Sequence, residues 1–264
     1  MTDILIAPPT VEPLTAAQAK LHLKSSQSAE DALVTAWIAA ARGQAERFLT
    51  KAIVLQTRRL VLDCLPSQID IEWAPLRAVQ SIQYLDEAGV LQTLAADQYR
   101  VDKFSSPARI TPGYDVTWPS TYGVPNAVLV TYTAGMLVPV VADAAADTLT
   151  ADGHGFADAD ITQIATIGGV LPTGLSASTN YHVRDSAANT LKLAATAGGA
   201  AIDITAAGTV PNVLGRIPKE IEAAMLLMIG DLDQHRGETV TGTLVQEISR
   251  GVESLLLPFK FQRF

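Results

Sequence analysis

The sequence contains almost no cysteine and no long apolar run. Cys64 is the single cysteine among 264 residues, which excludes an intrachain disulfide and favours synthesis inside the cell. No stretch approaches the ~20 consecutive apolar residues that a membrane-spanning helix needs. The N-terminal segment MTDILIAPPTVEP has an early Asp and no basic run, so we do not expect a signal peptide.

An excess of positive charge is also missing. Lys and Arg number 19 against 27 Asp and Glu, which gives a formal net charge of -8. Tight binding of nucleic acid requires a basic surface, so this balance argues against it while allowing a surface past which DNA slides. Hydrophobic residues make up 48% of the chain, enough for one large core or two smaller ones.

The composition changes near residue 138 and changes back near residue 213. Residues 138–213 contain 18 Ala and 8 Gly, and no Glu, Met, Trp or Cys. Seven Asp stand there against Arg184 and Lys192, a net charge of -5, whereas the rest of the chain carries -3. This shift predicts two units: a discontinuous domain of residues 1–137 and 214–264, and an inserted small β domain of residues 138–213.

Helical periodicity marks three parts of the outer domain. Thr15 and Gln18 have capping-box spacing ahead of a first helix, and Ser28 and Asp31 repeat that spacing ahead of a long second helix. The apolar face predicted for the second helix consists of Leu33, Trp37, Ile38, Ala41, Ala45, Phe48 and Leu49. After the insert, Pro218 starts a third helix whose core face is Ile217, Ile221, Met225, Met228, Ile229 and Leu232.

Period-two alternation predicts strands between the second helix and the insert. The expected strands cover residues 52–65, 69–73, 78–87, 90–95, 98–104 and 127–135. Arg58 and Arg59 lie in the middle of the first of these strands. We expect them on a solvated strand face, with an intersubunit salt bridge as the alternative, because exposed ion pairs contribute little.

The insert predicts about five short strands, at 147–151, 160–167, 179–185, 189–196 and 200–205. The sequence GHGFADAD brings His154, Asp158 and Asp160 within seven residues, which raises the possibility of a metal or acid–base site. The pattern has no second His and no spacing that fixes a coordination geometry. We therefore interpret it as a turn leading into a strand, and expect no metal and no catalytic residue there.

These elements predict an α+β fold: a helical bundle with a small antiparallel β-sheet or hairpins, plus an inserted all-β module. The chain ends in a short helix, a Pro258 stop and the tail Phe259, Lys260, Phe261, Gln262, Arg263 and Phe264. An exposed aromatic tail is costly on a monomer and is typical of a partner-binding surface.

With the insert removed, the order of elements resembles the head–tail connector (adaptor or head-completion) proteins of tailed bacteriophages and gene transfer agents. The resemblance rests on LTAAQAKLHLK, on IAAARGQAERF, on LQTRRLVLD, on VTYTAG, on IPKEIEAAMLLMIGDLDQHR and on GVESLLLPF. It covers residues ~14–137 and ~214–264. The chain departs from the family where Gln18 replaces a frequent Glu and where the insert follows VTYTAG. The insert resembles a small β-module that recurs in phage structural proteins.

The resemblance implies a structural, non-enzymatic virion protein without a cofactor. Such proteins are made in the host cytoplasm and form a ring, usually of twelve subunits, in the neck between capsid and tail. They bind the portal on one side and stopper or tail proteins on the other, and double-stranded DNA passes through the lumen. The portal contact implied here is the tail, through Phe259, Lys260, Phe261, Arg263 and Phe264; no membrane is involved.

Two other functions remain open from the residues alone. The insert could be a carbohydrate- or surface-binding module, although its single Tyr and its lack of Trp argue against a sugar platform. A metal-dependent hydrolase that uses His154, Asp158 and Asp160 is the weaker alternative.

Overall fold

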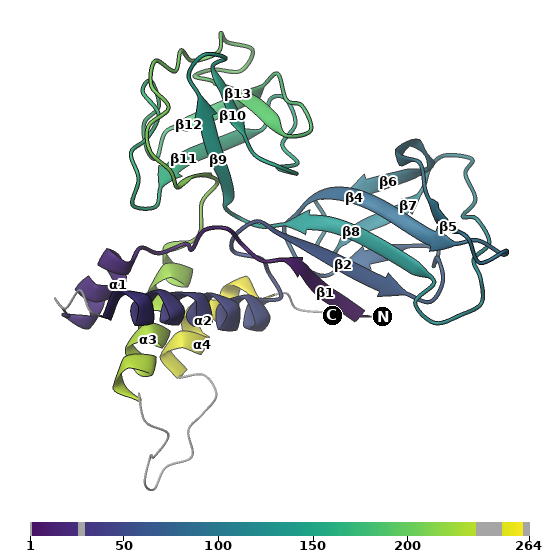
Figure 1. Ribbon diagram of the computed structural model, residues 1–264, viewed down its shortest axis with the longest axis horizontal. Coiled ribbons are helices and arrows are strands. Elements are labelled where there is room, and N and C mark those ends of the chain that lie inside the picture. Colours follow the sequence, from purple (N-terminus) through teal and green to yellow (C-terminus); the bar gives the residue numbers. More distant parts are fainter. Residues whose placement is uncertain (1, 26–29, 236–249, 261–264) are drawn as a thin grey trace, which may run out of the picture.

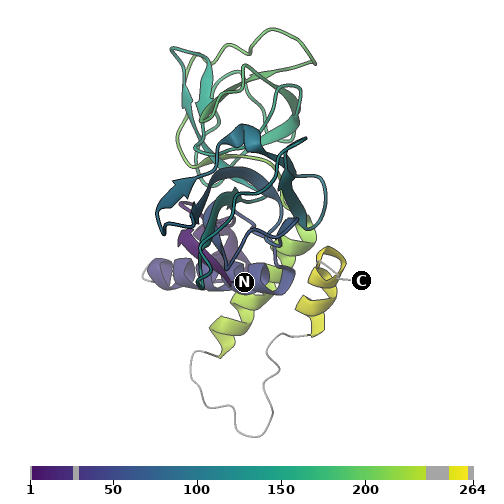
Figure 2. The ribbon, with the colours of Figure 1, turned by 90° about the vertical axis from the view of Figure 1, so that its right-hand side faces the viewer.

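The computed structural model describes residues 2–25, 30–235 and 250–260. These residues form a helical lobe, a lobe of two open antiparallel sheets and a closed β-barrel (Figure 1). In Figure 2 the barrel and the helices lie at opposite ends of the molecule. Each lobe has its own cluster of buried apolar side chains.

The helical lobe contains α1 (Ala16–Leu23), α2 (Asp31–Leu49), α3 (Lys219–Gln234) and α4 (Arg250–Leu256). The capping box of α1 is confirmed: Thr15 Oγ1 accepts from the Gln18 N–H at 3.1 Å, and Gln18 Oε1 accepts from the Thr15 N–H at 2.8 Å. Helix α2 has Glu30 as its N-cap without a side-chain cap bond, and Ser28 lies outside the described residues. None of the described helices is long and apolar enough to cross a bilayer.

The predicted core faces of α2 and α3 are largely confirmed. Buried α2 residues include Trp37, Ile38 and Ala41, but Leu33 is exposed and Val34 takes its place in the core. The five buried residues expected around α3 are Ile217, Ile221, Met225, Met228 and Ile229, and Leu232 packs against the same cluster. The prediction for the first turn of α2 is thus wrong by one residue, because Val34 and not Leu33 faces the core.

The open sheets contain eight strands in two groups. The five-stranded sheet has the order β1 (Thr2–Ala7), β2 (Gln56–Leu62), β8 (Val128–Ala134), β4 (Leu76–Leu85) and β5 (Leu91–Thr93). The three-stranded sheet has the order β3 (Ile69–Ile71), β7 (Ala108–Pro112) and β6 (Tyr99–Asp102). Their buried faces share one core that includes Leu60, Ile82, Ile110 and Val130. The sequence did not predict β1 or β7.

The barrel closes six strands around a third core. They are β9 (Val138–Asp143), β10 (Thr148–Thr150), β11 (Ile161–Thr166), β12 (Asn180–Arg184), β13 (Thr190–Ala194) and β14 (Asn212–Leu214). Four predicted strands match β10 to β13. The strand predicted at 200–205 is wrong, because only Ala201 bridges to Ala194 there. The ring is closed instead by β9 and β14, which the sequence did not predict.

The predicted fold class is therefore wrong. Strands hold more of the described residues than helices do, and the α-helices of the described chain number four. The sheets are not an accessory to a helical bundle, because they enclose a core of their own. The physical reason is long-range pairing: β2 binds β1 on one side and β8 on the other, and the paired residues lie 50 to 78 positions apart in the sequence.

Candidate functional site

The GHGFADAD segment forms a tight loop around a buried histidine. His154 is 1% exposed. Its Nε2–H donates to the Ala187 carbonyl at 2.9 Å, and its Nδ1 accepts from the Phe156 N–H at 3.0 Å. Both ring nitrogens are thus used, one within the loop and one by the connection between β12 and β13. Burial lowers the pKa of His154, so the neutral imidazole is the form that fits these two bonds.

The two aspartates of the motif bind backbone N–H groups of the same region. Asp158 accepts from the Ser186 N–H at 2.8 Å, and Asp160 accepts from the Ala157 N–H at 2.8 Å. Throughout the described ranges no group of three or more His, Cys, Asp or Glu side chains is arranged to hold a metal ion. The three residues therefore shape a turn, and the structure does not bring them together as a ligand set.

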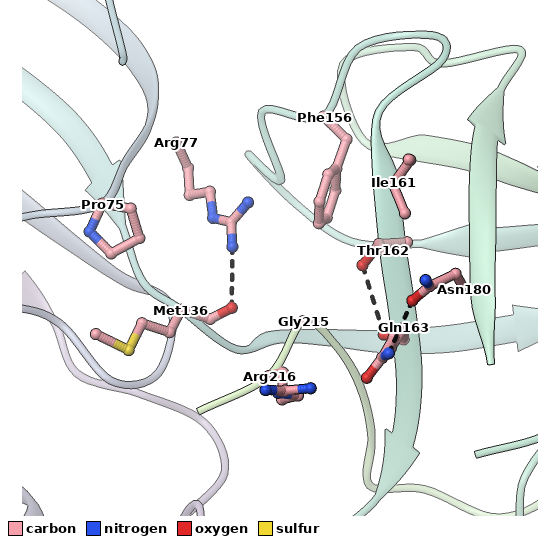
Figure 3. A pocket seen from close by; sticks show the side chains of 10 residues that line it. All are labelled: Pro75, Arg77, Met136, Phe156, Ile161, Thr162, Gln163, Asn180, Gly215 and Arg216. Carbon is pink, nitrogen blue, oxygen red and sulfur yellow. Dashed lines mark hydrogen bonds between the residues drawn. The ribbon is translucent and has the colours of Figure 1, made fainter. Parts of the chain in front are cut away.

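The side chain at the centre of the motif joins the barrel to the open sheet. Phe156 faces the Arg77 guanidinium, whose central carbon lies 4.8 Å from the ring centroid. Arg77 Nε donates to the Gly135 carbonyl at 2.7 Å and Nη2 donates to the Met136 carbonyl at 2.9 Å. Arg77 and Phe156 both line a hollow of about 400 Å³ (Figure 3). Burial lowers the pKa of Arg77 to about 10, so it remains charged at neutral pH.

Two further contacts hold the same loop against the sheets. Thr133 Oγ1 donates to the Gly153 carbonyl, and Lys103 Nζ donates to the Gly155 carbonyl, both at 2.8 Å. Gly155 has φ +63°, and a Cβ built there would lie 2.0 Å from the Arg77 carbonyl oxygen. A side chain at position 155 is therefore incompatible with this approach. We interpret the motif as the joint between barrel and sheet, which we call the barrel joint (Arg77, Lys103, Thr133 and residues 153–156).

A second polar cluster anchors the N-terminal strand. Arg58 Nε lies 2.5 Å from Asp3 Oδ1, and its guanidinium stacks 3.5 Å from the Trp73 ring centroid. The Tyr132 hydroxyl donates to the other Asp3 oxygen. Burial is the largest influence on Asp3 and raises its pKa. The expectation of a solvated face is wrong for Arg58, which is buried and paired within its own chain. Arg59 points to the other face and bonds the Thr131 hydroxyl.

The C-terminal segment folds back onto the helices as far as it is described. Phe259 ends a 3-10 turn (Leu257–Phe259) and packs against the helical core. Lys260 Nζ lies 4.5 Å from the Phe48 ring centroid. The remaining predicted portal-binding residues, Phe261, Arg263 and Phe264, lie outside the described residues.

Sequence reasoning missed Arg77 and Asp3. Each is a charged residue among apolar neighbours within a strand, in PLRAV and TDILIA. A charged side chain requires a partner when it is buried. A charge within an apolar strand could therefore have indicated that each residue is paired. The partners were not readable, because Gly135 and Arg58 lie 58 and 55 positions away.

In both clusters polar side chains hold parts of the fold together: Arg77 bonds the segment that leads into the barrel, and Arg58 holds Asp3 of β1. No protein-family model matches the chain, and no curated protein sequence matches it. Its fold is similar to chains in three solved gene transfer agent (GTA) particles. These are the neck of an empty GTA particle computed with C6 symmetry (TM-score 0.56, 16% identity), the virion of a native GTA particle (0.56, 15%), and the neck of a native GTA particle computed with C12 symmetry (0.53, 16%). Each match covers 100% of this chain and 97% of the other.

Proposed function

We propose that this chain is a structural subunit of the neck of a phage-like particle, where it forms an adaptor ring between the portal and the tail or stopper proteins. The observation that carries this proposal is the fold similarity over the full chain to proteins of particle necks. All three lobes take part in it, so the barrel belongs to the shared architecture. The ring we propose has twelve subunits, in keeping with the C12 symmetry of one similar neck.

The charge of the chain fits a passage for DNA. A net charge of -8 gives no basic surface that would hold the phosphate backbone. The described residues also lack a metal-binding cluster. We propose a non-enzymatic role in which the ring lumen lets the genome pass without sequence-specific contacts.

No observation favours the carbohydrate-binding alternative. Tyr181, the single tyrosine of the insert, is 4% exposed, and its hydroxyl accepts from the Ser176 N–H. Phe156 packs at the barrel joint against Arg77. The described barrel therefore offers no flat, exposed aromatic ring on which a sugar would stack.

We further propose that the last residues bind the portal. Removing residues 261–264 deletes Phe261, Arg263 and Phe264 and leaves Phe259 and Lys260 on the helices. The expected result is a folded subunit with an unchanged melting temperature that no longer co-sediments with portal-containing capsids.

The matched control is Phe259→Ala in the full-length chain. Because Phe259 packs against the helical core, this variant should melt at a lower temperature yet keep capsid binding at a permissive temperature. Unchanged capsid binding by the truncated chain contradicts the assignment of the tail to the portal.

A further inference from the structure

The five-stranded sheet has two free edges, and both expose large apolar side chains. On β1 the exposed fractions are 46% for Ile4, 46% for Leu5 and 47% for Ile6. At the other edge they are 54% for Val90 and 51% for Leu91. Figure 1 shows β1 and β5 at opposite ends of this sheet. The barrel is closed and has no free edge.

Strand β1 lacks most of the features by which proteins protect a sheet edge. Soluble proteins usually place Lys or Pro on such a strand, or twist it with a central bulge. Residues 2–7 contain no Lys and no Pro, and the register shift of β1 falls at its end, between Leu5 and Ala7. The strand is also fixed in place, since Asp3 is held by Arg58 and Tyr132. The unpaired backbone groups of β1 are therefore rigidly presented.

Unpaired charge near the two edges is of opposite sign. Arg59 lies on β2, the strand next to β1, and pairs in register with Ile4. It donates to Thr131 and has no ion-pair partner among residues 2–25, 30–235 and 250–260. Asp86 stands in the turn before β5, where hydrogen bonds from Gln92, Val90 and Ala88 lower its pKa and keep it ionised. Glu87 follows it in the same exposed turn. A β5 edge brought beside β1 therefore places two carboxylates near an uncompensated guanidinium.

Two different edges joined head to tail make a heterologous contact. Such a contact repeats from copy to copy and closes into a ring when its rotation allows, whereas a β1–β1 contact stops at a dimer. We infer that the partner of the β1 edge is the β5 edge of a second copy of this chain, so that the sheets are continuous around the ring. The inference rests on the proposed ring and assigns the surface that builds it.

The test uses a double-cysteine chain. Cys64 is exposed and is first replaced, as Cys64→Ser, to give a thiol-free background. Leu5→Cys and Leu91→Cys are then introduced together, and the assembled protein is treated with a short bismaleimide. We expect a ladder of covalent multimers on a denaturing gel, because every subunit carries both halves of the contact.

Two matched controls separate the geometries. Leu5→Cys alone should remain a monomer on the same gel. Leu5→Cys with Val170→Cys, which moves the second thiol to a barrel residue that is 62% exposed, should give no ladder. Melting curves establish that all variants are folded, as expected for substitutions at exposed positions.

Each outcome distinguishes this inference from the proposed function. Rings seen by mass photometry together with the ladder support both. Rings without a ladder, or dimers of Leu5→Cys alone, overturn the edge pairing and leave the ring intact. Absence of rings at every concentration, with and without portal, overturns the proposed function and the inference with it.

Discussion

The barrel and the five-stranded sheet are both antiparallel, but only the sheet has free backbone edges. The barrel pairs β9 with both β10 and β14, so that every strand has two neighbours. The sheet leaves β1 and β5 with one neighbour each. A closed sheet can meet the rest of the molecule through loops and side chains, whereas an open sheet can also pair through its backbone.

This difference explains where polar side chains are buried. At the barrel, the joint uses loop carbonyls, with Arg77 and Lys103 as donors. At the sheet, the buried pair of Arg58 and Asp3 fixes a strand in register. The contacts of Arg77 and Lys103 fix the barrel against the sheet. The Arg58–Asp3 pair fixes β1 in register at the edge of the sheet.

The largest effect should follow from removing the barrel. The barrel has its own core, including Leu149, Ile164 and Leu191, so a short flexible linker from Met136 to Arg216 should leave the helices and sheets folded. Leu137 and Val213 leave the helical core with it, which should cost roughly 4 kcal/mol. Circular dichroism measures whether the helices remain folded, and urea unfolding measures the loss of stability. An insoluble product or a lost helical signal contradicts the proposed division at residues 138–213.

Asp3→Ala should have the next largest effect. It leaves the buried Arg58 guanidinium without its carboxylate, and an unpaired buried charge costs roughly 3 kcal/mol. We expect a lower urea midpoint and faster amide exchange throughout β1. Asp152→Ala, which removes an exposed carboxylate, is the control and should change stability little. Equal effects of the two substitutions would show that the Asp3 anchor is unimportant.

Gly155→Ala tests the barrel joint. Its control is Gly198→Ala, because Gly198 has a similar positive φ. Gly198 has φ +69° and nothing within 4 Å of a built Cβ, whereas Gly155 has φ +63° and the Arg77 carbonyl at 2.0 Å. Gly198→Ala should cost about 1 kcal/mol for the left-handed backbone alone. Gly155→Ala should cost about 2 kcal/mol more, because the joint must open. Similar midpoints for both variants mean that the close approach is not needed.

The smallest effect concerns pH. Burial lowers the pKa of His154 from its ordinary value of 6.5. Its contribution to stability is therefore complete above pH 6.5, and it is lost as the pH falls through the lower, folded-state pKa. His154→Asn should be less stable at pH 7.5 and should show a flatter decline of melting temperature on acidification. A parallel decline in both proteins assigns the pH dependence to other groups.

Local chemistry determined part of this protein directly from sequence. The capping box at Thr15 and Gln18, the core face of α3 and the strands β10 to β13 depend on residues a few positions apart. Residue 138, where the composition changes, is the first residue of β9, and residue 213 lies within β14. The loop character of GHGFADAD followed from turn-forming residues alone.

Tertiary structure decided the rest, because the deciding partners are distant in sequence. Whether β1 exists depends on β2 accepting it, and whether the barrel closes depends on β9 meeting β14, some 70 positions later. Arg58 became a buried anchor only because Asp3 of β1 and Trp73, in the connection between β3 and β4, converge on it. Periodicity shows that a strand has two faces, but it does not reveal which strand lies beside it, and that choice turned an expected helical bundle into a mostly β protein.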